Sequence, residues 1–272
     1  MKSRVSAHKF TFFIFLTVFI TADGLRSLNA QSMTVRLSDQ QFVSKKWDNT
    51  RGLPVNTVFG VLKDEVGFLW AVTEEGLVRF DGKNFRTFNQ ENLPEIASPM
   101  FYDLTESSSG GIWAANANAI VHAYRNQIDV YRARDFAEGS WLTTISEDDQ
   151  GNVWAGTHDG DLLVLIDGEI RLAANWNSEG KGSVMTLKKI SDGLLIGTRT
   201  GLHKYHFDSG EIKEIPEFSG HEIRAVAESD TGNIWAGTRN SGILHQVQDS
   251  VVVIDQSKGL ANNQINSSRF YS

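Results

Sequence analysis

The chain has 272 residues, of which 22% are charged and 40% hydrophobic, and it carries a formal net charge of -7. This composition is ordinary for a globular protein, and the acidic balance argues against nucleic-acid binding. The chain has no cysteine, which excludes disulfides, thiolate metal sites and cysteine nucleophiles.

The first thirty or so residues have the pattern of a secretory signal. Lys2, Arg4 and Lys9 precede an apolar run over residues 10–22, which is shorter than the ~20 residues of a membrane-spanning helix. We therefore predict a signal peptide at 1–30 and an exported chain, periplasmic or secreted, over 31–272. The alternative is an uncleaved anchor, and only through this segment would the protein touch a membrane.

A short sequence motif centred on tryptophan recurs along the rest of the chain. Its first copy runs from Asp64 through Gly67 and Trp70 to Thr73 and Gly76. The anchor positions of the five copies are 43, 41, 41 and 40 residues apart and hold Trp70, Trp113, Trp154, Leu195 and Trp235. A period near 40 with short segments rich in β-branched and aromatic residues is typical of propeller blades. We predict that the anchors pack between adjacent sheets and do not bind ligand.

The repeat predicts an all-β propeller of four-stranded blades. The five blades are expected at about 56–92, 98–135, 141–175, 183–218 and 222–260, with an N-terminal closing strand at 42–47 and the start of a further blade at 264–272. The fourth strand and its turn occur six times, but the first three strands only five times. This count favours an open arc of a six- or seven-bladed ring, truncated in this chain. The alternative is a complete five-bladed ring with a redundant tail.

The lead-in Gly52-Leu-Pro-Val-Asn56, the turn from Asp64 to Trp70 and the segment from Thr73 to Gly82 resemble the two-component regulator propeller repeat. The resemblance covers the chain from about residue 42 onward. It implies seven-bladed propellers, often in tandem, that form the periplasmic sensors of hybrid histidine kinases or cyclase-type signalling proteins, many of which sense polysaccharide fragments. Asn116 replaces the family's Thr in the second copy, and Leu195 replaces the Trp in the fourth.

No group of residues in the sequence predicts catalysis, a metal site or a cofactor. Ligand-binding candidates are therefore sought where loops lead into the innermost strands, at Asn56, Trp141, His221 and Arg224. Trp141 lies outside the repeat register and suits stacking on a sugar, although packing under a loop is the alternative. Arg224 is expected to point into the central channel.

These observations predict a non-catalytic extracytoplasmic sensor. It would bind an unknown extracellular ligand, of which an oligosaccharide is one candidate, and would act through a signalling partner protein, because no kinase module is present in this sequence. The alternative is a secreted carbohydrate-active propeller enzyme, a lyase or hydrolase. A third hypothesis is a scaffold without a small ligand.

Overall fold

The computed structural model describes residues 45–133, 139–175, 182–248 and 250–265. The predicted signal peptide, residues 31–44 and most of the segment 264–272 lie outside these ranges. Within them no helix is long and apolar enough to cross a membrane.

Five four-stranded antiparallel sheets account for the described strands, each built from consecutive strands. The predicted all-β propeller architecture of four-stranded blades is confirmed. The strands are β1 (Val58–Lys63), β2 (Leu69–Thr73), β3 (Gly76–Phe80), β4 (Phe85–Phe88), β5 (Phe101–Glu106), β6 (Ile112–Asn116), β7 (Ala119–Tyr124), β8 (Gln127–Arg132), β9 (Leu142–Glu147), β10 (Val153–Thr157), β11 (Asp161–Ile166), β12 (Glu169–Asn175), β13 (Val184–Ile190), β14 (Gly193–Thr198), β15 (Leu202–His206), β16 (Ile212–Ile215), β17 (Ile223–Glu228), β18 (Ile234–Thr238), β19 (Ile243–Val247) and β20 (Ser250–Ile254). Two short 3-10 helices, η2 (Pro216–Phe218) and η3 (Gln256–Lys258), follow β16 and β20.

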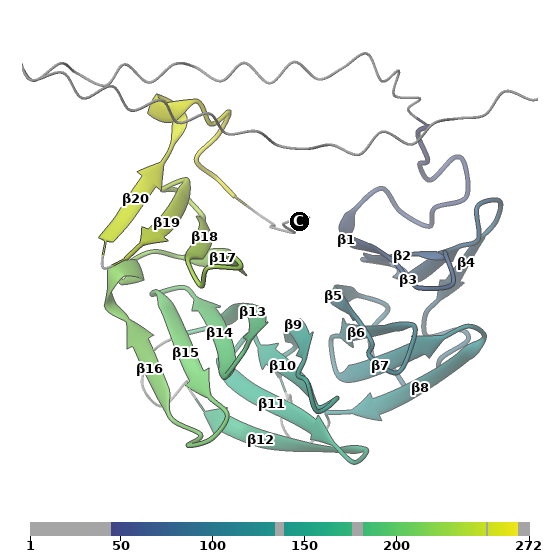
Figure 1. Ribbon diagram of the computed structural model, residues 1–272. Helices are drawn as coiled ribbons and strands as arrows, with labels where there is room; N and C mark the ends of the chain where they lie inside the picture. Colours follow the sequence, from purple (N-terminus) through teal and green to yellow (C-terminus); the bar gives the residue numbers. More distant parts are fainter. Residues whose placement is uncertain (1–44, 134–138, 176–181, 249, 266–272) are drawn as a thin grey trace, which may run out of the picture. The chain divides into compact units, whose positions relative to one another are not determined.

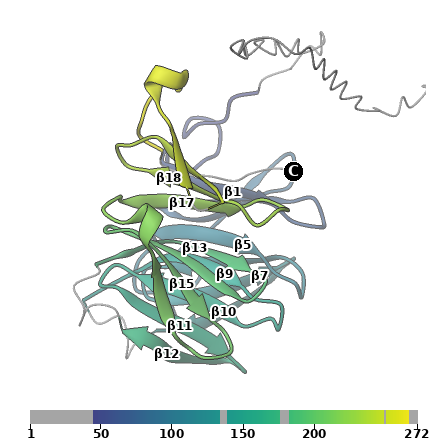
Figure 2. The same ribbon diagram turned by 60° about the vertical axis from the view of Figure 1, so that its left-hand side comes forward.

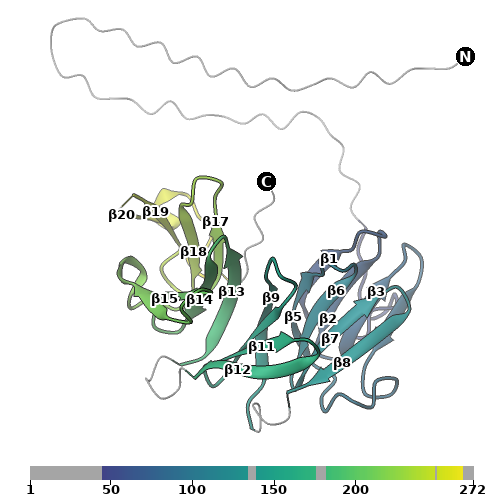
Figure 3. The ribbon, with the colours of Figure 1, turned by 60° about the horizontal axis from the view of Figure 1, so that its bottom comes forward.

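The first strand of each sheet is innermost. β5 lies beside β1 and β9, and β13 lies beside β9 and β17, an order that can be followed from three directions (Figures 1, 2 and 3). Figure 1 shows the five sheets around a common centre, with an opening between β1 of the first sheet and β17 of the fifth. The described unit is therefore an open arc of blades.

Each sheet has two apolar faces that meet different neighbours. We call the side that carries the anchor residue the forward face, and the opposite side the backward face. In the first interface, Trp70, Val72 and Leu77 of the forward face pack on Phe101 and Leu104 of the next sheet's backward face. The second, third and fourth interfaces repeat this arrangement around Trp113, Trp154 and Leu195. The anchors of these four interfaces are buried, whereas Trp235 of the fifth sheet is half-buried.

A glycine two residues after the anchor allows neighbouring sheets to approach closely. A Cβ atom added to Gly156 would lie 2.3 Å from a methyl carbon of Val184 on the next sheet, and one on Gly197 would lie 2.8 Å from Ile223. The same position in the fifth sheet, Gly237, meets Ile265 at 2.5 Å. In the third and fourth sheets this glycine contacts the first residue of the next sheet's inner strand. Ile265 takes that place on the fifth sheet.

In the first and third sheets, an aspartate side chain stabilises the turn before the anchor strand by accepting hydrogen bonds. The Asp64 side chain accepts hydrogen bonds from the backbone N–H groups of Val66, Gly67 and Phe68 and, at 2.8 Å, from Trp70 Nε1. Asp148 likewise accepts a bond from Trp154 Nε1 at 2.9 Å. These bonds join the turn to the interface, because one buried carboxylate satisfies both the backbone and the anchor ring.

The predicted closing strand at 42–47 needs a correction over its described part. No strand covers Lys45–Trp47, and residues 42–44 lie outside the described ranges. The physical reason is that each of the five described sheets takes its fourth strand from its own repeat, so none is a three-stranded sheet that this segment could complete. Trp47 instead packs edge-on against Phe80, with ring centroids 5.1 Å apart.

We predict that Asp64→Ala destabilises the fold far more than Ser229→Ala does. Asp64 is buried and accepts four hydrogen bonds, including the Trp70 ring bond, so its loss should cost about 3 kcal/mol. Ser229 occupies the same turn position in the fifth sheet. Its Oγ accepts from the backbone N–H of Asn233 and shares an exposed hydrogen bond with Thr231 Oγ1, so its loss should cost about 1 kcal/mol. Urea unfolding of both variants measures the difference, and equal losses would contradict this role of the carboxylate.

Candidate functional site

The inner strands of all five sheets line a central cavity of about 800 Å³. At one end lie the second residues of these strands, which are Phe59, Tyr102, Thr143, Met185 and Arg224. At the other end lie Glu106, Glu147, Lys189 and Glu228. The first end is thus aromatic and apolar over three of its five positions, and the second end is charged.

Four aromatic side chains form a row at the apolar end, which we call the aromatic row: Phe59, Tyr102, Trp141 and His158. The ring centroids of Phe59 and Tyr102 are 6.2 Å apart, and those of Tyr102 and Trp141 are 6.4 Å apart, each pair inclined by 19°. Trp141 stacks closely on His158, at 3.9 Å and 16°. The row thus runs from Phe59 and Tyr102, which line the cavity, to Trp141 and His158, which are not among its lining residues.

Hydrogen bonds at Trp141 and His158 and partial burial of the rings fix the position of the aromatic row. The backbone N–H of His158 donates to the Trp141 carbonyl at 2.9 Å, and His158 Nδ1 lies 3.4 Å from Ser183 Oγ. Tyr102, Trp141 and His158 are half-buried, whereas Phe59 is 43% exposed. Burial raises the pKa of the Tyr102 hydroxyl above its ordinary value, so this ring is a neutral hydrogen-bonding surface at physiological pH.

A charged cluster lies on the fifth sheet. Arg224 donates to Glu222 from both Nε and Nη2 at 2.9 Å, and Arg239 Nη1 donates to the other Glu222 oxygen at 3.2 Å. Burial by itself would raise the pKa of Glu222, but the hydrogen bonds from Arg224 and Arg239 outweigh it and hold the pKa below its ordinary value. The two guanidinium groups thus share the Glu222 carboxylate.

The four sequence-predicted ligand residues fall in different settings. Trp141 belongs to the aromatic row, and Arg224 lines the cavity as expected. His221 Nδ1 lies 3.1 Å from Ser241 Oγ, within a loop that leads into the fifth inner strand. Asn56 is exposed, and its Oδ1 accepts from the backbone N–H of Asn49 at 2.9 Å.

The Asn56 contact is a repeated structural feature. In the fifth sheet, Asn263 Oδ1 accepts from the backbone N–H of Gln256 at 2.8 Å, across the same spacing of seven residues. Asn56 is also absent from the residues that line the central cavity. Its geometry therefore fits the closing of a loop between sheets.

Phe59, Tyr102 and His158 were not among the residues that the sequence predicted. Phe59 and Tyr102 hold the same inner-strand position as Thr143, Met185 and Arg224, and this position varies from one repeat to the next. A comparison of variable positions across the repeats could have found them, because core positions repeat and this one does not.

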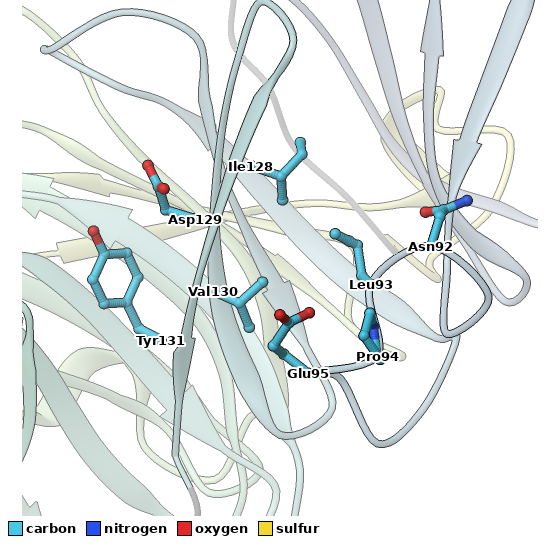
Figure 4. A pocket seen from close by; sticks show the side chains of 8 residues that line it. All are labelled: Asn92, Leu93, Pro94, Glu95, Ile128, Asp129, Val130 and Tyr131. Atoms are coloured by element: carbon cyan, nitrogen blue, oxygen red, sulfur yellow. The ribbon is translucent and has the colours of Figure 1, made fainter.

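A second cavity, of about 440 Å³, lies on the outer strand of the second sheet. Figure 4 shows its lining, residues 92–95 of the segment between the first two sheets and residues 128–131 of β8. Burial, and then the charge of Asp129, raise the pKa of Tyr131. Over the described ranges no cluster of three or more His, Asp or Glu side chains could hold a metal ion. The central cavity is the stronger candidate because it is the larger of the two and all five sheets line it.

No family model matches the chain, and no curated protein matches it in sequence. Solved structures match its fold. An extracellular domain assigned to a hybrid two-component system of B. thetaiotaomicron is 18% identical with a TM-score of 0.54, over 79% of this chain and 36% of that one. Virginiamycin B lyase from Staphylococcus aureus is 17% identical with a TM-score of 0.59, over 72% and 69%. The β-propeller domain of Myceliophthora thermophila Cps50 is 15% identical with a TM-score of 0.51, over 72% of each chain.

These likenesses show the propeller fold. The chain spans about a third of the length of the B. thetaiotaomicron domain. Because sensor domains and lyases share this architecture, the fold does not choose between binding and catalysis.

We predict that Glu222→Gln lowers the free energy of unfolding near neutral pH and that this effect becomes smaller in acid. A carboxylate whose pKa is lower in the folded than in the unfolded state stabilises the fold above its unfolded pKa, and that stabilisation is lost as the pH falls through the folded pKa. The stability difference between the wild type and Glu222→Gln should therefore shrink as pH is lowered from about 6 to about 3. Urea unfolding across this range measures it, with Glu214→Gln on β16 as the control. A difference that does not change with pH would contradict the ion-pair assignment.

Proposed function

We propose that this chain is the extracytoplasmic ligand-binding domain of a signalling system and that the aromatic row is where its ligand binds. The observation that carries the proposal is that Phe59 and Tyr102 line one end of a cavity of about 800 Å³ and that Trp141 continues their row of nearly parallel rings. The rings do not follow the repeat, so blade packing does not account for them. The likeness in fold to an extracellular domain assigned to a two-component system supports the setting.

The chemistry of the row fits a ligand with flat apolar faces and a polar or anionic edge. Ring faces offer dispersion and C–H contacts to such a ligand, and the Tyr102 hydroxyl can donate a hydrogen bond. Arg224 lines the same cavity and adds a charged donor for oxygen atoms. An oligosaccharide has both kinds of surface, and we take it as the first ligand class to test.

The domain is proposed to act by binding alone. The residues of the aromatic row and the Glu222 cluster supply stacking and charge, without a nucleophile paired to a base. Output would pass to a separate signalling partner after export. The fold of virginiamycin B lyase leaves a carbohydrate-active enzyme as the competing function, and the experiment below decides between them.

We predict that Tyr102→Ala and Trp141→Ala each weaken oligosaccharide binding by the exported chain. The probes are oligosaccharides from partial digests of a polysaccharide panel, measured by isothermal titration calorimetry. Loss of one stacking ring should cost about 2 kcal/mol, about thirtyfold in Kd. Trp47→Ala is the matched control, because this half-buried ring packs on Phe80 outside the cavity. Binding that both aromatic-row variants leave unchanged, or turnover of a bound oligosaccharide, would contradict the proposal.

A further inference from the structure

Each inner strand carries a β-bulge at its second residue. In β5, Phe101 pairs with Asn116 of β6 and Asp103 pairs with Ala115, so that Tyr102 between them is an extra residue. The other four inner strands show the same register shift at the same position. The five extra residues, which we call the bulge residues, are Phe59, Tyr102, Thr143, Met185 and Arg224.

The bulge separates the packing of the inner strand from its contact with the cavity. In a regular strand, residues three apart face opposite sides of the sheet. Phe101 and Leu104 nevertheless lie in the same core cluster, because the bulge between them adds one residue. The same spacing joins core residues of the next three inner strands, which are Leu142 and Ile145, Val184 and Leu187, and Ile223 and Val226. The bulge residue itself is therefore not needed for this packing.

All five bulge residues line the central cavity. None of them is buried, although the residue before each is fully buried in the second to fifth sheets. Bulges that turn a side chain out of the regular pleat are frequent next to functional sites. The repeated backbone thus presents five different side chains to one cavity, and these side chains determine which ligand the cavity selects.

Arg224 is the one charged residue among the five bulge residues. Thr143 Oγ1 lies 3.0 and 2.6 Å from the carbonyl oxygens of Gly156 and Val184, so its hydroxyl serves the fold. Of the other three, two are aromatic and one is methionine, and they offer mainly apolar contact. A ligand that meets all five positions is therefore distinguished from others of similar shape by the group it presents to Arg224.

The ion pair with Glu222 orients the Arg224 guanidinium. Glu222 Oε1 accepts from Nε and Nη2 of Arg224, while Arg239 binds the other oxygen. The Arg224 and Glu222 side chains are only 24% and 18% exposed, so the guanidinium is held in place before a ligand arrives. An arginine fixed in this way is suited to a carboxylate, because the two oxygens of that group match its planar N–H donors.

Acidic side chains also line the cavity, but they lie away from the place that an anion at Arg224 would take. Asp103 is turned toward β9, where its Oδ2 accepts from Thr144 Oγ1 at 2.9 Å and from the backbone N–H of Ile145 at 3.0 Å. Glu228 ends the same strand as Arg224, and four strand residues span about 13 Å. This separation exceeds the Debye length of about 8 Å at physiological salt.

We propose that Arg224 is the specificity-determining residue of the central cavity and that it selects oligosaccharides that carry the carboxylate of a uronic acid. One sugar unit would stack on Phe59 and Tyr102, and the carboxylate of another unit would bind Arg224. Figure 1 places β17, which carries Arg224, across the opening from β1. This inference rests on the proposed function, because it concerns the ligand of the same cavity.

Paired oligosaccharides test the proposal. The probes are partial digests of polygalacturonate, alginate and glucuronoxylan, each compared with the same oligosaccharides after their carboxyl groups have been reduced to alcohols. Calorimetric titration of the exported chain measures Kd for both members of each pair. Loss of the charge-assisted hydrogen bonds should weaken binding of the reduced member about thirtyfold in at least one pair.

Two variants assign this preference to a residue. Arg224→Gln should bring the Kd values of that pair to within about twofold of each other. Arg239→Gln is the matched control, because it removes a guanidinium from the same Glu222 carboxylate but is not among the residues that line the cavity. It should keep a preference of about thirtyfold. Urea unfolding establishes that both variants are folded before they are titrated.

The outcomes separate this inference from the proposed function. Equal binding of both members of every pair by the wild type would overturn the inference and leave the proposed function standing. A preference that Arg224→Gln retains, or that Arg239→Gln also loses, would overturn the assignment to Arg224. Binding of no oligosaccharide, acidic or reduced, would contradict the proposed function together with this inference.

Discussion

The structure depends on one contact, repeated four times: the forward face of a sheet packed on the backward face of the next. A four-stranded sheet that buried only one of these faces would leave large apolar side chains in water, at a cost of about 25 cal/mol per Å². Stability in such an array is close to a sum of blades and their interfaces. The end sheets, with one interface each, are therefore the least supported parts of the arc.

The contact tolerates variation in its details. Leu195 replaces tryptophan in the fourth sheet and is still buried at 1% exposure. In the second sheet Ser107 holds the aspartate position, and Trp113 Nε1 has no hydrogen-bond partner among the described residues. The ring stays buried and stacks on His122, with centroids 4.3 Å apart. Apolar packing therefore matters more to the interface than the hydrogen bond from the ring.

The sequence predicted the parts that repeat but only some of those that do not. Trp70, Trp113, Trp154 and Leu195 were recognisable as interface residues because packing imposes the same demand on every blade. Phe59 and Tyr102 share an inner-strand position that packing leaves free, so no period marks them. Trp141 was found because it stands outside the register. The segment 42–47 resembles the fourth strand at 85–88, but such a strand also needs a three-stranded sheet to complete, and all five described sheets already have four strands.

The same distinction separates structure from function here. Repeated positions build the arc, and the unrepeated positions of Phe59 and Tyr102 line one end of its cavity. Val61 is a repeated position that is 48% exposed because it lacks its usual neighbour. The most direct test is a cysteine scan of one repeat position, with Val61, Leu104, Ile145, Leu187 and Val226 each replaced in turn. Val61→Cys should react with maleimide about a hundredfold faster than the other four, because they react only through local opening. Five equal rates would contradict the account.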